Sequence, residues 1–503
     1  MSEIQNFYDG KNIFITGGTG AVGKILVEKL LRTCPGIGII YLLIRTKRGT
    51  EPKDRLEKFL HSDVFNVLKK SNVDYKNKIV GISGDIGKPN LGISYKDREI
   101  IKKEVSIVFI AAATVRFDEP LPVAASLNVN SVKEVIVLCH ECEGLKAAIY
   151  VSTAYSYCVN NTIKEELYPP PMTFEEINVV THLMENQYWT EESKKQFTKG
   201  LLGNWPNTYS FTKAIAEGIV AEEGKNLPLN IFRLSIGIAS YREPLPGWTD
   251  NLLGFNGLVV AVAVGAVHVT VCDPNANADI VPIDMACNAL ISSAWETAIK
   301  NSRNEETYVY NYVSGPENPI TWGNLVQTMI DYNSKIAMNV AVYYIFFILT
   351  KSYTLYVTLD FLLHRIPALL VDLILRIFGK QPMMHKIYKK AHKVTVAIIY
   401  FLQHEWIFEN YRVQSLWESL SDEDKKLFPF SMAECEWQDV IWLHLVGMKK
   451  YILKEDMSRE AQKKAFKRRD ILNTIHYTIK YSFFTYVIWM LWKIGLYISS
   501  SFL

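Results

Sequence analysis

The sequence predicts an α/β fold: a Rossmann-like, doubly wound parallel sheet with a smaller subdomain and a helical, hydrophobic C-terminal domain. Three observations predict it. Residues 11–23 pass from an apolar run through a glycine-rich turn into a helix, and further short apolar runs alternate with helical stretches as far as residue 234. Strands that alternate with helices form parallel sheets covered on both faces. Aromatic and aliphatic residues then concentrate after residue 335, which predicts the separate C-terminal region.

The first strand ends in a turn that suits a dinucleotide. Glycines permit a tight turn and close approach of a pyrophosphate, and the following helix, KILVEKLLR, offers free N–H groups at its N-terminus. A glycine turn alone is weak evidence and can be purely structural, but its position between a strand and a helix favours a bound cofactor. The residues expected to contact the cofactor are Thr16, Gly17, Thr19, Gly20 and Gly23.

The second apolar run, IGIIYLLIR, predicts which nicotinamide cofactor binds. Sites that prefer NAD usually place Asp or Glu at the end of this strand. This chain places Arg45 there, followed by Lys47 and Arg48. A guanidinium can pair with a 2′-phosphate, so the pattern favours NADPH over NADH. The alternative is a solvated basic loop.

Two further strands add cofactor contacts. The third, KIVGISGD, ends at Asp85, which we expect at the adenine end of the cofactor. The fourth, SIVFIAAAT, ends in small residues from Ala111 onward. Small side chains there allow a ring and a ribose to lie close to the backbone, at the edge where parallel sheets bind their ligands.

The predicted catalytic residues follow the fifth strand, LKAAIYV. Ser152 and Thr153 stand at its end, and Tyr209 and Lys213 lie four residues apart on a predicted helix, NTYSFTKAIAE, and so share one face. A lysine ammonium near a phenol should lower the phenol pKa. We therefore expect Tyr209 as proton donor, Lys213 as its tuner and ribose anchor, and Thr153 or Ser152 as the hydroxyl that orients the substrate oxygen. The alternative for this pair is an ordinary surface helix.

Composition limits the other function classes. The 503 residues exceed one ordinary domain, and the net charge of +3 argues against a nucleic-acid partner. The seven cysteines are dispersed, which indicates a reducing compartment. Cys139 and Cys142 fall on one predicted helix without a second pair, so we interpret them as packing residues and expect no metal site.

The C-terminal segment has the composition of a membrane-associated helix. Residues 481–503 carry no charge except Lys493 and are long enough to cross a bilayer, with a basic stretch at 463–470 on the expected cytosolic side. A helix packed on the protein is the alternative. For 340–403, a membrane segment and a buried helical domain remain equal alternatives. We divide the chain into a cofactor-binding domain with substrate-binding insertions (1–335), a helical domain (336–470) and a hydrophobic tail (471–503).

The chain resembles the fatty acyl-CoA reductases, a family of extended short-chain dehydrogenases/reductases, and specifically the insect-type alcohol-forming members. The resemblance covers nearly the whole chain and rests on FITGGTGAVGK, YLLIRTKRG, VSTAY, YSFTKA, REPLPGW, ADIVPIDMA and LWESLSDEDKKLFPF, in this order. It implies reduction of a fatty acyl-CoA by two NADPH to the primary alcohol. It also implies membrane lipid as a partner, at the endoplasmic reticulum or alternatively the peroxisome, with the catalytic domain in the cytosol. A homo-oligomer is left open.

The resemblance also assigns residues. It implies that Arg45 contacts the 2′-phosphate, that Asp85 and Ile86 form the adenine-side turn, and that Asn128 holds the active-site helix and a water. It implies that Thr153, Tyr209 and Lys213 form the catalytic set.

Several positions depart from the family pattern. Ile110 replaces a histidine, Leu234 replaces a proline, and the glycine- and lysine-rich turn expected near 260–268 is replaced by AVAVGAVHVT at 261–270. Two alternatives therefore stay open: an NADPH-linked alcohol or sterol dehydrogenase, and a catalytically silent membrane scaffold. Residues 160–206 form a long insertion, interpreted as a lid or as a solvated excursion, and 244–258 are expected to form one wall of an acyl tunnel.

Overall fold

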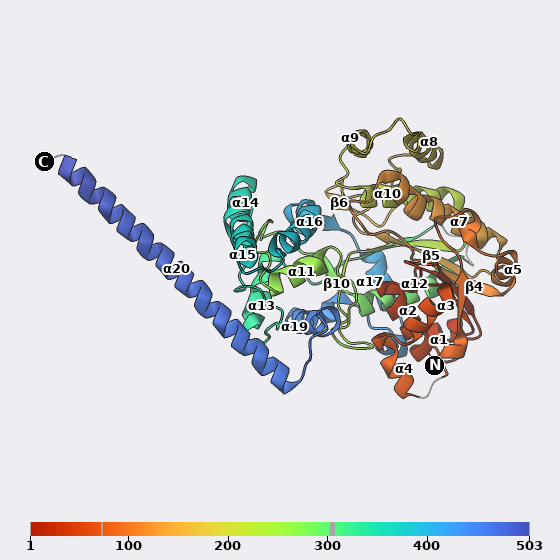
Figure 1. The fold of residues 1–503 in the computed structure, drawn as a ribbon. Helices are drawn as coiled ribbons and strands as arrows, with labels where there is room; N and C mark the ends of the chain where they lie inside the picture. Colours follow the sequence, from red (N-terminus) through yellow and green to blue (C-terminus); the bar gives the residue numbers. More distant parts are fainter. Residues whose placement is uncertain (1, 72–73, 302–306, 502–503) are drawn as a thin grey trace.

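A seven-stranded parallel sheet forms the centre of the computed structural model, which describes residues 2–71, 74–301 and 307–501 (Figure 1). The strand order is β11-β7-β5-β4-β1-β2-β3, so the direction of winding reverses between β1 and β4. The predicted doubly wound sheet is confirmed, and ligands of such sheets bind at this reversal. The strands are β1 (Asn12–Thr16), β2 (Ile40–Ile44), β3 (Ile79–Ser83), β4 (Val105–Ile110), β5 (Ala147–Thr153), β7 (Leu229–Leu234) and β11 (Val309–Tyr312).

Alternate residues of each strand enter the two layers of core. Ile13 and Ile15 of β1 pack with the layer that holds α2 (Ala21–Thr33) and α12 (Ile283–Asn301), whereas Phe14 packs with the opposite layer. This is the period of two that a strand imposes, with both faces apolar as a buried parallel sheet requires. The opposite layer contains α5 (Tyr95–Glu104), α7 (Ser131–Glu141) and α10 (Thr208–Glu223).

The remaining elements of residues 2–335 surround this sandwich. In Figure 1 the insertion helices α8 and α9 lie outside α10, on the side away from the sheet. Shorter strands pair as β8 with β10 and β9 with β12. The bounds are α1 (Glu3–Tyr8), α3 (Pro52–Leu60), α4 (Asn66–Lys70), α6 (Leu121–Ala125), β6 (Thr162–Ile163), α8 (Phe174–Met184), α9 (Glu191–Leu202), β8 (Ile236–Ile238), α11 (Phe255–Ala263), β9 (Val269–Val271), β10 (Ile280–Pro282) and α13 (Trp322–Asp331).

The C-terminal region divides in two. One part forms a helical group beside α11 and α13: β12 (Ile348–Thr350), α14 (Tyr353–Asp360), α15 (Ile366–Ile377) and α16 (Met384–Gln403). The other part returns to the sheet domain, where Phe428 and Phe430 join the same core as Ile13. Its elements are β13 (Ile407–Phe408), α17 (Tyr411–Ser419), α18 (Asp422–Leu427) and α19 (Trp437–Gly447).

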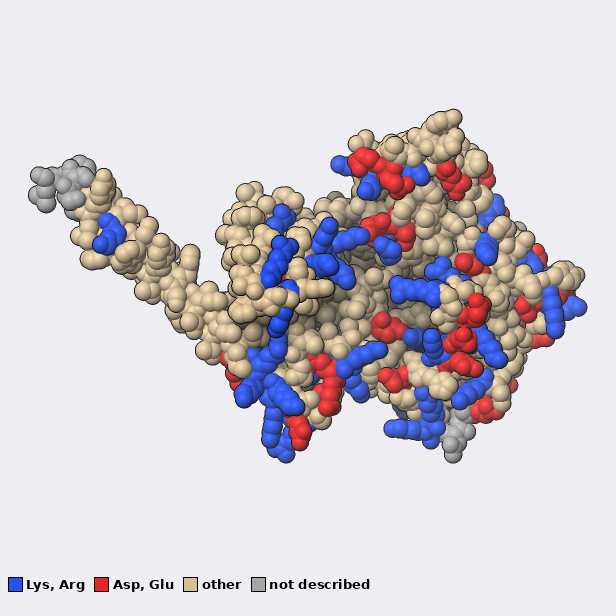
Figure 2. All heavy atoms as spheres, viewed as in Figure 1, with Lys and Arg blue, Asp and Glu red and all other residues tan. Residues whose placement is uncertain are grey.

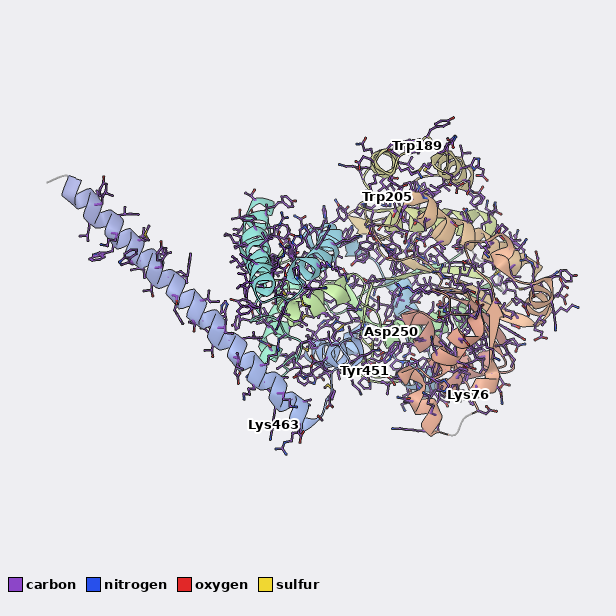
Figure 3. The ribbon with its side chains drawn as sticks, viewed as in Figure 1. Lys76, Trp189, Trp205, Asp250, Tyr451 and Lys463 are labelled. Carbon is purple, nitrogen blue, oxygen red and sulfur yellow. The ribbon has the colours of Figure 1, made fainter. Side chains whose placement is uncertain are left out.

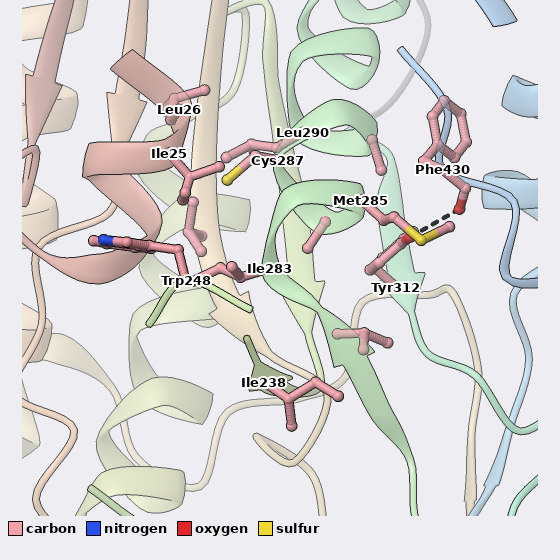
Figure 4. Packing of buried hydrophobic residues seen from close by; sticks show 14 of the residues in the cluster. Ile25, Leu26, Ile238, Trp248, Ile283, Met285, Cys287, Leu290, Tyr312 and Phe430 are labelled. Atoms are coloured by element: carbon pink, nitrogen blue, oxygen red, sulfur yellow. Dashed lines mark hydrogen bonds between the residues drawn. The ribbon is translucent and has the colours of Figure 1, made fainter. Parts of the chain in front are cut away.

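Figure 4 shows this second part against the sheet domain. The hydroxyl of Tyr312, on edge strand β11, donates to the carbonyl of Phe430 at 2.8 Å, and Met285 and Cys287 of α12 pack nearby. All seven cysteines are free thiols. The C-terminal region therefore completes the core of the N-terminal one.

A single 43-residue helix, α20 (Arg459–Ser501), ends the described chain and extends away from the body (Figure 1). Its first half is anchored: Arg468 donates to the carbonyl of Ala341 at 2.7 Å. Its second half exposes Phe483, Trp489 and other apolar side chains. Among the described residues, one helical segment is long and apolar enough to cross a bilayer, Leu121–Glu141, but 56% of its most apolar window is buried in the protein, as in a core helix.

Candidate active site

The carboxyl ends of the central strands open into one cavity of about 1290 Å³, including the space at its mouth. Ala21 of α2, Ala111 after β4, Thr153 of β5, and Tyr209 and Lys213 of α10 all line it. The cavity thus lies at the reversal of the sheet, where the strand order predicts a ligand. Thr153 thus meets the Tyr209 and Lys213 pair, more than 50 residues away in the sequence, at the start of the glycine-loop helix.

The glycine turn is packed so tightly that side chains are excluded. Gly17 has φ +75°, and a Cβ on it would lie 2.7 Å from the backbone of Ala111. A Cβ on Gly23 would lie 2.5 Å from the carbonyl oxygen of Gly17, whose oxygen also accepts from the Gly20 N–H at 2.9 Å. Thr16 joins the neighbouring strands, because its Oγ1 accepts from the backbone N–H of Ala112 at 3.2 Å.

This turn fits a pyrophosphate. Helix α2 is capped by Gly20 without a side-chain hydrogen bond, and its first turn contains no acidic residue. Its N-terminal N–H groups and dipole are therefore available to an anion, and Ala21 and Val22 bring this end to the cavity wall. Figure 3 labels Asp250, on the loop beside α2; its carboxylate pairs with Lys24 at 2.5 Å.

Basic side chains gather beside the turn. Arg45 and Lys47 are exposed after β2, and Arg55 of α3 donates to the Thr19 hydroxyl at 3.2 Å and to the carbonyl of Arg45. Although its side chain is exposed, Lys47 has a lowered pKa, from partial desolvation first and then from the charges of Arg55, Arg45 and Arg48. The group suits a phosphate dianion.

The third strand ends in its own turn. Asp85 accepts from the N–H of Gly87 at 3.1 Å, and Ile86 packs on the core layer below. Both side chains are half-buried. The turn at 85–87 therefore has a defined shape, and its carboxylate already has one backbone partner.

Tyr209 and Thr153 line the same cavity, and the Thr153 side chain lies near enough to the phenol to affect its pKa. The phenol ring stacks on Phe117 at 5.7 Å between ring centres. Burial raises the pKa of Tyr209 to about 12, and the nearby Thr153 side chain only partly offsets this. The phenol is therefore protonated at neutral pH and can act as a proton donor.

Lys213 is placed differently from the expectation that it tunes Tyr209. Its Nζ donates to the carbonyl of Val151 at 2.7 Å and to the hydroxyl of Tyr150 at 3.2 Å. Burial lowers the pKa of Lys213 to about 7, although the carboxylate of Glu217 opposes this. The Tyr209 pKa is raised rather than lowered, because desolvation of the phenol dominates it.

Asn128 fastens α10 to the loop after β4. Its Oδ1 accepts from the N–H of Thr114 at 2.8 Å, and its Nδ2 donates to the hydroxyl of Thr212 at 3.0 Å. Ser152 serves the same helix from β5, since its hydroxyl donates to Glu217 at 2.5 Å. These contacts position Tyr209 and Lys213.

The rest of the cavity wall is mostly apolar. Residues 253–255, within the loop expected to form a tunnel wall, and Phe401 and Leu402 of α16 line it. The insertion at 160–206, which the structure describes completely, contributes no lining residue. It packs outside α10 instead, where Trp205 donates to the carbonyl of Ser156 at 2.9 Å (Figure 3).

Comparisons with known proteins decide the family. Two family models described as male sterility protein match, an NAD-binding one over residues 15–290 and a Sterile one over 363–455. "Fatty acyl-CoA reductase wat" of Drosophila melanogaster is 40% identical over 98% of this chain and 93% of its own. Human "Fatty acyl-CoA reductase 1" is 36% identical over the same shares. The chain belongs to the fatty acyl-CoA reductase family.

A solved structure supports the fold of this reductase. The reductase domain of a nonribosomal peptide synthetase from Mycobacterium tuberculosis superposes with a TM-score of 0.58 at 17% identity, over 88% of this chain and 92% of that one. The site, the NAD-binding match and the family together make the protein an oxidoreductase that uses a nicotinamide cofactor.

Sequence reasoning missed several residues of this site. Glu217 and Arg233 form an ion pair of 2.7 Å behind Ser152, and both are almost completely buried. The sequence could have indicated both residues, because Glu217 lies one helical turn after Lys213 and Arg233 is a charged residue inside an apolar strand. Tyr150 and Arg55 gave no such signal, since their roles come from the packing of neighbouring elements.

Proposed function

We propose that this reductase converts a long-chain fatty acyl-CoA to the primary fatty alcohol with NADPH and releases coenzyme A. One observation carries the proposal: Thr153 and Tyr209 line one cavity together with the N-terminus of α2 and an apolar wall. A dinucleotide site, a proton donor and a place for an alkyl chain are the parts that this reaction needs. The names of the curated relatives support the same substrate class.

The basic group favours NADPH over NADH. In the proposal Arg45 contacts the 2′-phosphate, with Lys47 and Arg55 close by, and the glycine turn with α2 receives the pyrophosphate. Asp85 and Ile86 face the adenine, while Ala111 leaves room for the ribose. Two reductions in succession, each with one hydride from NADPH, take the thioester to the aldehyde and the aldehyde to the alcohol.

Tyr209 is proposed to stabilise the oxyanion in the first reduction and to donate a proton in the second. Thr153 and Tyr209 hold the carbonyl oxygen and stabilise the charge it gains. When the first adduct collapses, the C–S bond breaks and coenzyme A leaves as a thiolate. Tyr209 protonates the alkoxide formed by the second hydride, which is favourable because an alkoxide is more basic than a phenolate.

The other site residues support the reaction by anchoring the cofactor or by positioning Tyr209. Lys213 is the proposed anchor for the nicotinamide ribose, from its position at the carbonyl of Val151. Asn128 and Ser152 keep α10 in register with β5 and with the loop after β4. Their substitution should therefore lower turnover without removing the chemistry.

An assay with purified full-length protein tests the proposal. Palmitoyl-CoA and NADPH should give hexadecanol with two NADPH oxidised per alcohol. Oxidation of a secondary alcohol instead would identify an alcohol or sterol dehydrogenase. NADPH binding without either reaction would identify a silent scaffold.

Tyr209→Phe tests the proton donor. Loss of a positioned general acid should lower kcat by about 10²–10⁴-fold while leaving the Kd for NADPH nearly unchanged. Tyr155→Phe is the control, because Tyr155 lines the same cavity but packs against Phe401 and Trp406. Equal activity of Tyr209→Phe and the wild type would refute the assignment.

We also propose that the reductase attaches to membrane lipid. The second half of α20 carries exposed aromatic and aliphatic residues, with Lys493 as a single charge in residues 481–498. The surface of α14–α16 adds to it. Between residues 351 and 403 the acidic residues are Asp360 and Asp372, and both are buried, so the exposed charges there are basic. Figure 2 shows blue side chains over this group of helices.

Exposed apolar residues of α15 and of the turn between α14 and α15 complete this lipid-facing surface. Phe361, Leu370, Ile374 and Ile377 each expose at least half of their side chain. Apolar residues beside lysines are typical of helices that lie in a membrane interface. We infer attachment to the endoplasmic reticulum, or alternatively the peroxisome, with residues 1–335 as the catalytic domain, 336–470 as the helical domain and 471–503 as the tail. Residues 1, 72–73, 302–306, 502 and 503 lie outside the described structure.

A further inference from the structure

A second cavity lies between α11 and α13, next to the catalytic one. It measures about 580 Å³ including open space, and every lining residue except Asn333 is apolar. Leu258, Val259 and Val262 line it from α11, and Val326 and Met329 line it from α13. A cavity of this composition favours a hydrocarbon over water.

Helix α11 connects the two cavities. Phe255 lines both of them, and residues 258, 259 and 262 continue the same face of the helix at the spacing that a helix predicts. The helix spans about 12 Å from its first residue to its last. A chain that follows this face passes from the catalytic cavity into the second one.

The ring of Phe255 stands where the cavities adjoin. It packs against Trp322 at 5.5 Å and stacks on His444 at 6.2 Å between ring centres. Burial lowers the pKa of His444 to about 3, so this partner is a neutral ring. The partition between the cavities is therefore made of aromatic side chains, without a charge that would repel an alkyl chain.

The second cavity explains why this chain lacks the lysine-rich turn that the family pattern has near 260–268. A lysine-rich turn would suit phosphates, but this chain continues α11 to Ala263 and places Val262 and Ala263 on the wall of the second cavity. The segment therefore contacts hydrocarbon. The phosphates of coenzyme A need another site.

We propose that the second cavity receives the methyl end of the acyl chain, with Phe255 as the gate and the α13 side chains as the floor that limits chain length. This inference rests on the proposed function, because it takes an acyl chain anchored at Tyr209 as its starting point. Each methylene that enters should strengthen binding about fourfold, from about 0.8 kcal/mol per buried CH₂.

A photolabelling experiment tests where the chain ends. Full-length protein in detergent is irradiated with palmitoyl-CoA that carries a diazirine at its terminal carbon, and labelled peptides are identified by mass spectrometry. We expect the label on residues 255–263 and 322–331. Label confined to other segments would overturn the inference. The readout needs no turnover, so labelling there without alcohol formation would contradict the proposed reaction and leave the cavity assignment standing.

Substitutions on α13 test chain-length control. Val326→Phe fills the cavity, whereas Gln327→Phe adds the same ring to an exposed position of the same helix. Each protein receives one mixture of decanoyl-, palmitoyl- and stearoyl-CoA with NADPH, so partition into detergent cancels between variants. Val326→Phe should lower the ratio of octadecanol to decanol at least tenfold, and Gln327→Phe should leave it unchanged.

Met329→Ala provides the opposite change. The shorter side chain lengthens the cavity, so the share of octadecanol among the products should exceed that of the wild type. Destabilisation of the protein alone would not raise this share. Identical product ratios in the wild type, Val326→Phe, Met329→Ala and Gln327→Phe would overturn the inference.

Discussion

Lys213 places an amino group where burial opposes its charge. The side chain is 3% exposed, and its pKa is lowered to about 7. In the unfolded chain a lysine keeps its proton to about pH 10.4. Between these values the unfolded state binds more protons, so stability rises with pH through this window, and the cost of the buried ammonium is fully present below pH 7.

This predicts a pH trend for Lys213→Met. The difference in thermal midpoint between the variant and the wild type should favour the variant most at pH 6.5 and should shrink toward pH 9.5. The reason is that the free energy of unfolding of the wild type rises by up to about 1.4 kcal/mol per pH unit in this window. Lys225→Met, at an exposed position after α10, should differ from the wild type by a constant amount. A constant difference for Lys213→Met as well would contradict the lowered pKa.

A second prediction at the residue scale concerns Arg45 and the preference for NADPH. Arg45→Asp replaces a guanidinium by a carboxylate that repels a 2′-phosphate, so the ratio of kcat/KM for NADPH to that for NADH should fall about a hundredfold. Lys53→Asp makes the same change of net charge at an exposed position of α3 and serves as the control. If both variants shift the ratio equally, the preference for NADPH comes from the overall positive charge of this region and not from Arg45.

At the scale of elements, α10 and β7 are joined by a buried ion pair. Arg233 contacts Glu217 at 2.7 Å, and Glu217 also accepts from Ser156 at 2.8 Å. The guanidinium donates further to the carbonyls of Lys164 and Glu166, which fastens the start of the insertion. This pair therefore fixes the helix that carries Tyr209.

Removing one partner leaves the other charge buried. Glu217→Ala should cost about 3–5 kcal/mol of stability, since Arg233 then lacks its carboxylate. Glu222→Ala, on the exposed side of the same helix, should cost less than about 0.5 kcal/mol. Thermal unfolding of both variants with the wild type decides the prediction, and equal losses would contradict it.

The elements also show what a sequence can and cannot predict. Strands β1 to β5 and the helix with Tyr209 follow from apolar runs and glycine turns, because local patterns determine them. The direction of Lys213 toward Val151, and the place of Glu217, depend on how α10 packs on β5. The return of residues 428–432 to the sheet core likewise depends on long-range packing that periodicity does not encode.

At the scale of the molecule, α16 links the proposed lipid surface with the catalytic cavity. Its first half presents Lys386, Lys389 and Lys390 to solvent, and its last turns contribute Phe401 and Leu402 to the cavity wall. One helix therefore reaches from the proposed lipid surface to the proposed site of reaction. An acyl chain held in a bilayer would meet the apolar wall without crossing much water.

This arrangement predicts two separable modes of membrane binding. A chain that ends at Lys480 keeps the contacts of α20 with residues 333–344 and loses only the exposed apolar half. It should remain soluble enough to measure, and it should bind vesicles with anionic lipid reversibly and less strongly as salt rises. The full chain should resist extraction by salt.

Charge removal on α16 then separates the two modes. Replacing Lys386, Lys389 and Lys390 by Gln in the shortened chain should weaken binding to anionic vesicles roughly a hundredfold, at about 1 kcal/mol per lysine. The same replacement of Lys194, Lys195 and Lys199 on α9 removes equal charge outside the proposed lipid surface and should have little effect. Vesicle sedimentation at low salt measures both. If the α9 variant loses as much affinity as the α16 variant, attraction follows net charge alone and α16 does not face the membrane.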